Sequence, residues 1–196
     1  MKKIILPLVL VIVLASGVLI GLRMKDSDKD SSSDSSNNSS STEEKSSASS
    51  KDTLDLSDKG LTSVTKSVYS ETNTKVLDLS NNSLKTLPSE IGKMTKVEEL
   101  YLNDNQLEGS LVGELRQMSN LRILDASNNN LTGLIGEIGQ LNKLEVLNLA
   151  NNGLTDLPNE LQNLTGLKTL DLSGNKVSVS TIATLKSALV NTDIVY

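Results

Sequence analysis

The sequence predicts an α/β domain: a solenoid with a short, curved parallel sheet on its concave face and short helical or 3-10 turns on its convex face. One pattern, L-x-x-L-x-L-x-x-N-x-L, occurs five times between Thr74 and Val177. Its Asn recurs every 23 or 24 residues, at Asn82, Asn105, Asn129, Asn152 and Asn175. The alternating leucines of each copy place apolar side chains on one face of a short strand. Because one copy cannot bury that face alone, neighbouring copies are expected to stack and share a core.

The repeats occupy residues 74–177, and a degenerate copy at 53–73 precedes them as a predicted N-terminal cap. This copy has Lys59 where the others have Asn. Between strands, apolar pairs three residues apart predict one turn of α- or 3-10 helix packed on the core. Pro88 and Pro158 suit the start of such a turn. The pairs are Ile91 with Met94, Leu115 with Met118, Ile138 with Leu141, and Leu161 with Leu164.

On these motifs, the chain resembles the leucine-rich repeat family from Asp52 to Tyr196. The segment from Leu131 to Leu141 resembles the longer, plant-type repeat, with Gly136 in place of the family's usual Pro. The other copies resemble the short intracellular or bacterial type, so the subclass is mixed. We expect a small, membrane-anchored or secreted member of bacterial type. The resemblance implies a solenoid whose concave sheet face is the surface that binds partners.

The repeated Asn residues lie where each strand ends and the chain turns. A side-chain amide donates and accepts hydrogen bonds at once, so a ladder of Asn satisfies backbone groups that the turn leaves unpaired. We therefore predict a structural, buried role for all five rather than ligand binding.

The pattern breaks after Val177, and residues 178–196 are predicted to form a C-terminal cap. Ser178 to Asn191 is predicted to be an amphipathic helix, capped by Ser180 or Ser178, with Ile182, Leu185 and Leu189 on one side. Asp193 to Tyr196 is predicted to add a last short strand. Such a helix would cover the final layer of an open solenoid.

Residues 1–25 carry an uncharged apolar run from Ile4 to Leu22. As a helix, this run would span about 28 Å, close to the hydrocarbon thickness of a bilayer. Two interpretations compete. A signal anchor would keep the run in the membrane, whereas a signal peptide would be cleaved at Ala15-Ser16-Gly17. We favour the anchor, because cleavage after Gly17 leaves an apolar tail on the mature protein.

Residues 26–52 are rich in Ser and Asp and contain no large apolar residue. Such a segment cannot bury enough surface to offset its ordering entropy, so we predict a disordered tether. Together with the anchor, it indicates a single-pass protein of the cell membrane whose repeat domain lies on the extracytoplasmic side. The alternative is a secreted protein.

Composition excludes several function classes. The chain has no Cys and no His, which removes thiol and Ser-His chemistry and the usual zinc sites. The net charge is −5 and the basic residues are scattered along the sequence, which argues against nucleic acid as a partner. The glycines from Gly133 to Gly139 lack the Lys of a phosphate-binding loop and suit turns better. We predict no enzyme activity and no cofactor or metal.

Given the resemblance, the outward positions of the strands are the candidate partner site. Three columns are expected to run across the sheet, the central one between the two strand leucines of each copy. Tyr101 is the single aromatic residue among them and the preferred contact, since Tyr is a common interface anchor. The candidate contact residues are Asp78, Glu99, Tyr101, Asn103, Ile123, Asp125, Asn148 and Asp171.

The predicted function is therefore a membrane-tethered module that binds a protein or peptide, expected to be monomeric. The acidic central column favours two sharper hypotheses, a basic partner or a hard cation between carboxylates. Against both, the resemblance implies that Asp and Ser at these places hydrogen-bond along the sheet. A surface structural or adhesion protein is the alternative function, and an enzyme is less favoured.

Overall fold

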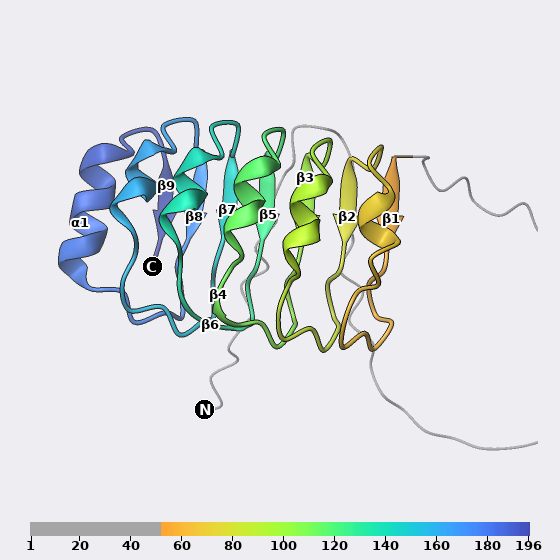
Figure 1. The fold of residues 1–196 in the computed structure, drawn as a ribbon. Coiled ribbons are helices and arrows are strands. Elements are labelled where there is room, and N and C mark those ends of the chain that lie inside the picture. The colour runs from red at the N-terminus through yellow and green to blue at the C-terminus, as the bar shows by residue number, and fades with distance from the viewer. Residues whose placement is uncertain (1–51) are drawn as a thin grey trace, which may run out of the picture. The chain divides into compact units, whose positions relative to one another are not determined.

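The computed structural model describes residues 52–196, in which a parallel sheet lies on one face and a row of helices on the other (Figure 1). The sheet has seven parallel strands in the order β1-β2-β3-β5-β7-β8-β9, so successive repeats lie side by side. Its strands are β1 (Thr53–Asp55), β2 (Val76–Asp78), β3 (Glu99–Tyr101), β5 (Ile123–Asp125), β7 (Val146–Asn148), β8 (Thr169–Asp171) and β9 (Asp193–Val195). The predicted fold class is confirmed for this part of the chain.

Equivalent residues of neighbouring repeats pair directly across the sheet. Leu77 of β2 pairs with Leu54 of β1 on one side and with Leu100 of β3 on the other. The same register continues to β9, where Leu170 pairs with Ile194. The sequence period thus becomes a spatial column, and the first two of the three outward columns expected from the sequence are aligned as predicted.

The convex face is built from five 3-10 helices followed by one α-helix. They are η1 (Val68–Ser70), η2 (Ser89–Lys93), η3 (Gly113–Gln117), η4 (Gly136–Gln140), η5 (Asn159–Asn163) and α1 (Val179–Ala188). All four predicted apolar pairs are buried against the core, with exposed fractions of 5% or less. Pro88 and Pro158 lie immediately before η2 and η5, in extended backbone, where the missing N–H is no loss.

A second, two-stranded parallel sheet was not predicted. It pairs β4 (Glu108–Ser110) with β6 (Asn130–Gly133). All three residues of β4 are exposed, so the segment shows none of the apolar alternation that marks a half-buried strand. The sequence indicates this sheet only indirectly, because the sheet lies where one repeat is 24 rather than 23 residues long.

The core is a continuous stack of leucines with a few other side chains. Besides Leu, Ile and Val, it contains Met94 and Met118, which were predicted to pack on the core, and Tyr69, which was not. Tyr69 is only 1% exposed, and its hydroxyl has no hydrogen-bond partner among the described residues. It belongs to η1 in the first repeat, where a large side chain replaces the Gly92 found 23 residues later.

The C-terminal cap follows the prediction closely. Ser178 caps α1 by accepting a hydrogen bond from the Thr181 N–H at 3.1 Å, which settles the choice between Ser178 and Ser180. Ile182, Leu185 and Leu189 are buried. The chain then returns to the sheet as β9, the last strand of the row.

No helix within residues 52–196 is long and apolar enough to cross a membrane. The predicted anchor at 1–25 lies outside the described residues, as does the predicted tether except for its last residue, Asp52.

Candidate protein-interaction face

The Asn ladder holds each turn to the repeat before it. Asn105 shows the pattern: its Oδ1 accepts a hydrogen bond from the Leu84 N–H at 3.0 Å, in the preceding repeat. Its Nδ2 donates to the Leu79 carbonyl, also in the preceding repeat, and to the Leu102 carbonyl of its own. The other ladder residues bond in the same way, which confirms the structural role of Asn82, Asn105, Asn129, Asn152 and Asn175. The predicted burial is confirmed for the first three and is wrong for Asn152 and Asn175, which are half-buried.

Because each ladder Asn bonds backbone groups of the preceding repeat, the missing Asn of the degenerate first copy can be explained as well. Asn82 accepts hydrogen bonds from the N–H groups of Lys59 and Leu61, so the first turn is served by the second repeat. An Asn at position 59 would have no earlier repeat within 52–196 to bond. The substitution by Lys therefore follows from the position of this copy at the end of the row.

Three columns of side chains cross the concave sheet and contain carboxylates but no Lys or Arg. We call them together the concave face. The first column runs from Thr53 to Asp193, the second from Asp55 to Val195, and the third is made of the residues two positions after the second. All eight predicted contact residues lie in these columns and are half-buried: Asp78, Glu99, Tyr101, Asn103, Ile123, Asp125, Asn148 and Asp171. The carboxylates of the first two columns are Asp55, Asp78, Glu99, Asp125, Asp171 and Asp193.

The aspartates of the second column share one turn geometry. Ser80 donates both its backbone N–H and its hydroxyl to Oδ1 of Asp78, at 2.9 and 2.6 Å. Ser127 does the same to Asp125, at 3.0 and 2.6 Å. These Ser–Asp hydrogen bonds join residues two positions apart, so they run within a repeat and not along the sheet, as the family resemblance had implied. Between strands, Asn148 donates a hydrogen bond to Asp125 at 3.0 Å. In residues 52–196, however, Oδ2 of Asp78 accepts no hydrogen bond, so one carboxylate oxygen stays available to a partner.

Tyr101 lies half-buried in this column, between Asp78 and Asp125 of the neighbouring strands. Its hydroxyl donates a hydrogen bond to Oε2 of Glu99 at 2.8 Å. Burial, together with that hydrogen bond and the surrounding carboxylates, raises the pKa of Tyr101 above its ordinary value. The ring is thus a fixed part of the face and stays neutral at physiological pH.

Neither a metal cluster nor an enclosed substrate site coincides with the concave face. Among the described residues, no three His, Cys, Asp or Glu side chains gather in a way that could hold a metal ion. A crevice of about 170 Å³ lies instead between η5 and α1, lined by residues such as Pro158, Gln162 and Thr184. None of the predicted contact residues lines it.

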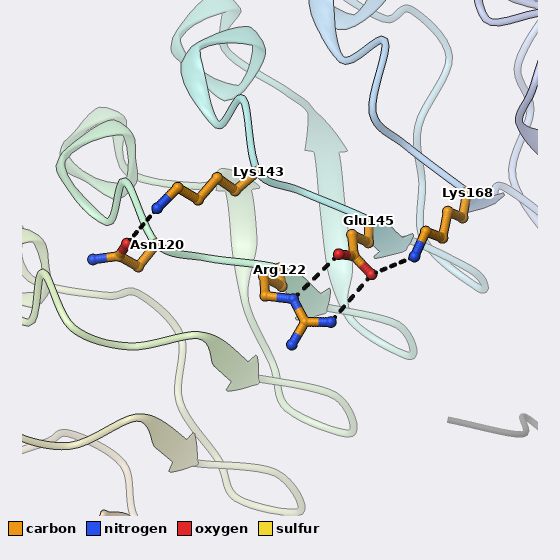
Figure 2. A network of polar contacts seen from close by, with 5 residues as sticks. All are labelled: Asn120, Arg122, Lys143, Glu145 and Lys168. Carbon is orange, nitrogen blue, oxygen red and sulfur yellow. Dashed lines mark hydrogen bonds and ion pairs between the residues drawn. The ribbon is translucent and has the colours of Figure 1, made fainter. Parts of the chain in front are cut away.

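A second polar arrangement, at the amino-terminal edge of the sheet, was missed by sequence reasoning. One residue precedes each strand there, and its charge alternates along the row: Asp52, Lys75, Glu98, Arg122, Glu145 and Lys168. We call this row the alternating ladder. Arg122 forms two contacts of 3.2 Å with Glu145, and Lys168 reaches the same carboxylate at 2.9 Å (Figure 2). Beside them, Lys143 donates to Asn120 at 2.7 Å (Figure 2).

The alternating ladder corrects the description of the basic residues as scattered. Their intervals of 23 or 24 residues bring Lys75, Arg122 and Lys168 to one edge, where carboxylates pair with them. Hydrogen bonds from Arg122, and then from Lys168, lower the pKa of Glu145 below its ordinary value. Because this edge neutralises its own charge, the field of the sheet comes mainly from the unpaired carboxylates of the concave face.

Comparison with known proteins agrees with this architecture. A family model described as leucine rich repeat matches residues 52–107 and 119–177, more than half of the chain. The leucine-rich repeat protein LIC12759 of Leptospira interrogans is 36% identical, with a TM-score of 0.71, over 74% of this chain and 36% of that one. No curated protein sequence matches the chain.

Two further solved structures are similar over comparable lengths. Internalin C2 of Listeria monocytogenes is 27% identical, with a TM-score of 0.63, over 73% of this chain and 59% of that one. The Arabidopsis receptor kinase HAESA, solved with the peptide hormone IDA and the co-receptor SERK1, is 30% identical with a TM-score of 0.65. That match covers 77% of this chain but 26% of HAESA, so the chain spans less than two thirds of each of these relatives. From its motifs, its repeat register and these matches, the chain belongs to the leucine-rich repeat family.

Proposed function

We propose that the repeat domain binds a basic protein or peptide on its concave face. The observation that carries this proposal is the charge of that face: six carboxylates in its first two columns and no cation in any of the three. A surface of one sign steers partners of the opposite sign and disfavours others. Structures such as HAESA with a peptide hormone and a co-receptor support a protein or peptide as the class of partner.

The face offers more than charge. Val76, Ile123 and Val146 stand half-buried in the first column, next to the carboxylates and the Tyr101 ring. A partner with basic side chains and apolar stems, such as Lys or Arg, would match both features, because those side chains cover apolar surface while their charged ends stay at carboxylates. Pairing with the free carboxylate oxygen of Asp78 would leave its turn hydrogen bonds intact.

The proposal includes a location. The sequence of residues 1–52 indicates a membrane anchor and a polar tether, and the domain would then display its concave face outside the cytoplasm. Fractionation of the expressed full-length chain, with its intact mass and protease accessibility in whole cells, tests this part. A soluble product that begins near Val18 would replace the tethered module with a secreted binder.

Site-specific crosslinking tests the binding face itself. A photoreactive amino acid replaces Tyr101 in the full-length chain expressed in its native host, and Gln140, exposed on convex η4, carries the same probe as a control. We expect a crosslinked partner from position 101 alone. The double change Asp78→Lys with Asp125→Lys should abolish this product, whereas Glu137→Lys with Glu160→Lys on the convex helices, an equal change in charge, should leave it. Equal crosslinking from both faces would disprove the proposal.

A further inference from the structure

Asn152 differs from the other four residues of the Asn ladder in the residue that follows it. Gly153 comes directly after Asn152, whereas each of the other four is followed by a residue that carries a side chain. In the whole sequence, no other Asn precedes a Gly. Because glycine has no Cβ, its backbone nitrogen is the least hindered one that a neighbouring side chain can meet. This pair therefore has a reactivity that the rest of the ladder lacks.

The reaction open to an Asn-Gly pair is deamidation through a cyclic imide. The backbone nitrogen of Gly153 attacks Cγ of Asn152, so that a new N–C bond forms and the side-chain amide leaves as ammonia with the proton of the attacking nitrogen. Water then opens the imide at either carbonyl. Opening at Cγ gives aspartate, and opening at the main-chain carbonyl gives isoaspartate, whose backbone runs through the side-chain methylene. The whole sequence consumes only water.

In the fold, hydrogen bonds keep both reacting groups out of this reaction. The Gly153 N–H donates to the Leu131 carbonyl at 2.7 Å, and Oδ1 of Asn152 accepts from the Leu131 N–H at 3.0 Å. Nδ2 of Asn152 donates to the carbonyls of Ala126 and Leu149, at 3.0 Å each. Attack requires the Gly153 nitrogen to give up its hydrogen bond and the Asn152 side chain to turn away from its partners. Only an opening of this layer permits both changes.

The product of deamidation cannot take the place of Asn152 in the ladder. A carboxylate accepts hydrogen bonds but donates none. The carbonyls of Ala126, Leu149 and Ala150 would therefore lose their side-chain donor and face a negative charge instead. In isoaspartate, the added methylene also lengthens the backbone at the turn. A modified chain would thus refold with unsatisfied carbonyl groups between two repeats, which disfavours the native stack.

We propose that Asn152 is a site of spontaneous deamidation that the Asn ladder keeps unreactive while the domain is folded. Opening of this layer exposes the pair to the reaction, and a chain modified there does not return to the native ladder. The lifetime of the folded domain is then set by how often this layer opens as well as by the free energy of unfolding. This inference does not depend on the proposed function of the concave face.

Peptide mapping of the full-length chain tests the protection by the fold. The chain is incubated in mild detergent at mildly alkaline pH, with and without guanidinium chloride, while circular dichroism verifies the folded and unfolded states. Trypsin then releases residues 144–168, which contain Asn152, and residues 97–116, which contain Asn105 as an internal control. We expect the amide-to-acid mass change at Asn152 in guanidinium, and at least about a hundredfold more slowly in the folded chain, because a central layer opens rarely. Asn105 should react far more slowly than Asn152 in guanidinium.

The variant Gly153→Gln tests the role of the glycine, since it reproduces the pair that Asn105 forms with Gln106. A Cβ at position 153 would lie 3.2 Å from the Leu131 carbonyl oxygen, so variant and wild type are compared in guanidinium, where both are unfolded. The variant should lower the rate at Asn152 to that of Asn105. Equal rates in variant and wild type would overturn the proposal, as would equal rates in the folded and the unfolded wild type.

Removal of guanidinium from a partly modified sample tests the consequence for refolding. Modified chains should be depleted from the refolded fraction, and Asn152→Asp should lower the guanidinium midpoint of unfolding. Asn151→Asp is the matched control, because it makes the same change in charge where Asp58 and Asp104 stand in other repeats with the same positive φ. This control should lower the midpoint less. Modified chains that refold in undiminished proportion, or equal midpoints for the two variants, would overturn the proposal.

Discussion

The central repeats and the end repeats have the same sequence pattern but different environments. Leu147 and Leu149 of a central repeat have a neighbouring layer on both sides and are fully buried. Leu54 and Leu56 occupy the same positions in the first copy, yet they are half-buried, because no layer within 52–196 precedes them. In a solenoid, the contribution of a residue to the free energy of unfolding therefore depends on the neighbouring layers more than on its position in the motif.

The largest difference in stability is expected when one leucine of a central layer and one leucine of the N-terminal layer are each replaced by Asp. Leu147→Asp puts a carboxylate where neither water nor a cation can reach it, so we expect loss of the cooperative fold. Leu54→Asp makes the same change at a half-buried position and should cost about 1–2 kcal/mol while the domain stays folded. Urea denaturation followed by circular dichroism measures both. An equal effect of the two changes would mean that the end layer is covered like a central one.

A second, smaller difference in stability is expected between a central and a terminal residue of the Asn ladder. Asn129 is buried and serves four backbone groups, among them the Leu107 N–H at 2.9 Å and the Leu102 carbonyl at 3.0 Å. Asn129→Ala should cost about 3 kcal/mol, because those groups are left unsatisfied away from water. Asn175 makes equivalent bonds in a half-buried position, so water can replace part of them, and Asn175→Ala should cost about 1 kcal/mol. If the two Asn→Ala variants lost the same free energy of unfolding, this expected difference would be wrong.

The smallest effect is expected at a residue that distinguishes the first repeat. The Tyr69 hydroxyl is buried without a partner in the described part of the chain, so Tyr69→Phe should be neutral or stabilise the domain by up to about 1 kcal/mol. Destabilisation by more than this amount would show that the hydroxyl has a partner.

The dependence of stability on alkaline pH is a second test of the buried Tyr69 hydroxyl. Burial raises the pKa of Tyr69 to about 12, whereas the unfolded chain has the ordinary value near 10. The unfolded state therefore loses this proton first, and the stability that the neutral phenol contributes is lost as pH rises from about 10 to 12. Tyr69→Phe should reduce the fall in urea midpoint between pH 7 and pH 11. Tyr101 is present in both proteins and does not affect the difference.

Most of the secondary structure could be predicted from the sequence because its signals are local. The strand leucines, the apolar pairs of the convex helices and the capping helix at 179–188 each show a period that a short window reveals. Strands β4 and β6 could not, because β4 is exposed along its whole length and β6 has a single buried residue, Leu131. The burial of Tyr69 was missed for a similar reason: only packing against the second repeat decides it.

The candidate site was likewise predictable from the sequence only in part. The columns of the concave face follow from counting residues, and the structure aligns them in that register. The alternating ladder was equally present in the sequence, at intervals of 23 or 24 residues, but single charges carry no local signal of their partners. Arg122, Glu145 and Lys168 become a network only when three repeats are stacked.

By itself, the sequence determined the family, the number and register of the repeats, and the acidic character of the concave face, since a fixed period allows one stable way of stacking the leucines. The tertiary structure decided which polar groups meet: Tyr101 with Glu99, Glu145 with its two cations, and each Asn with the repeat before it. Apart from the Tyr101–Glu99 pair, whose residues are two positions apart, the named polar contacts join residues more than 20 positions apart, and no local pattern encodes them.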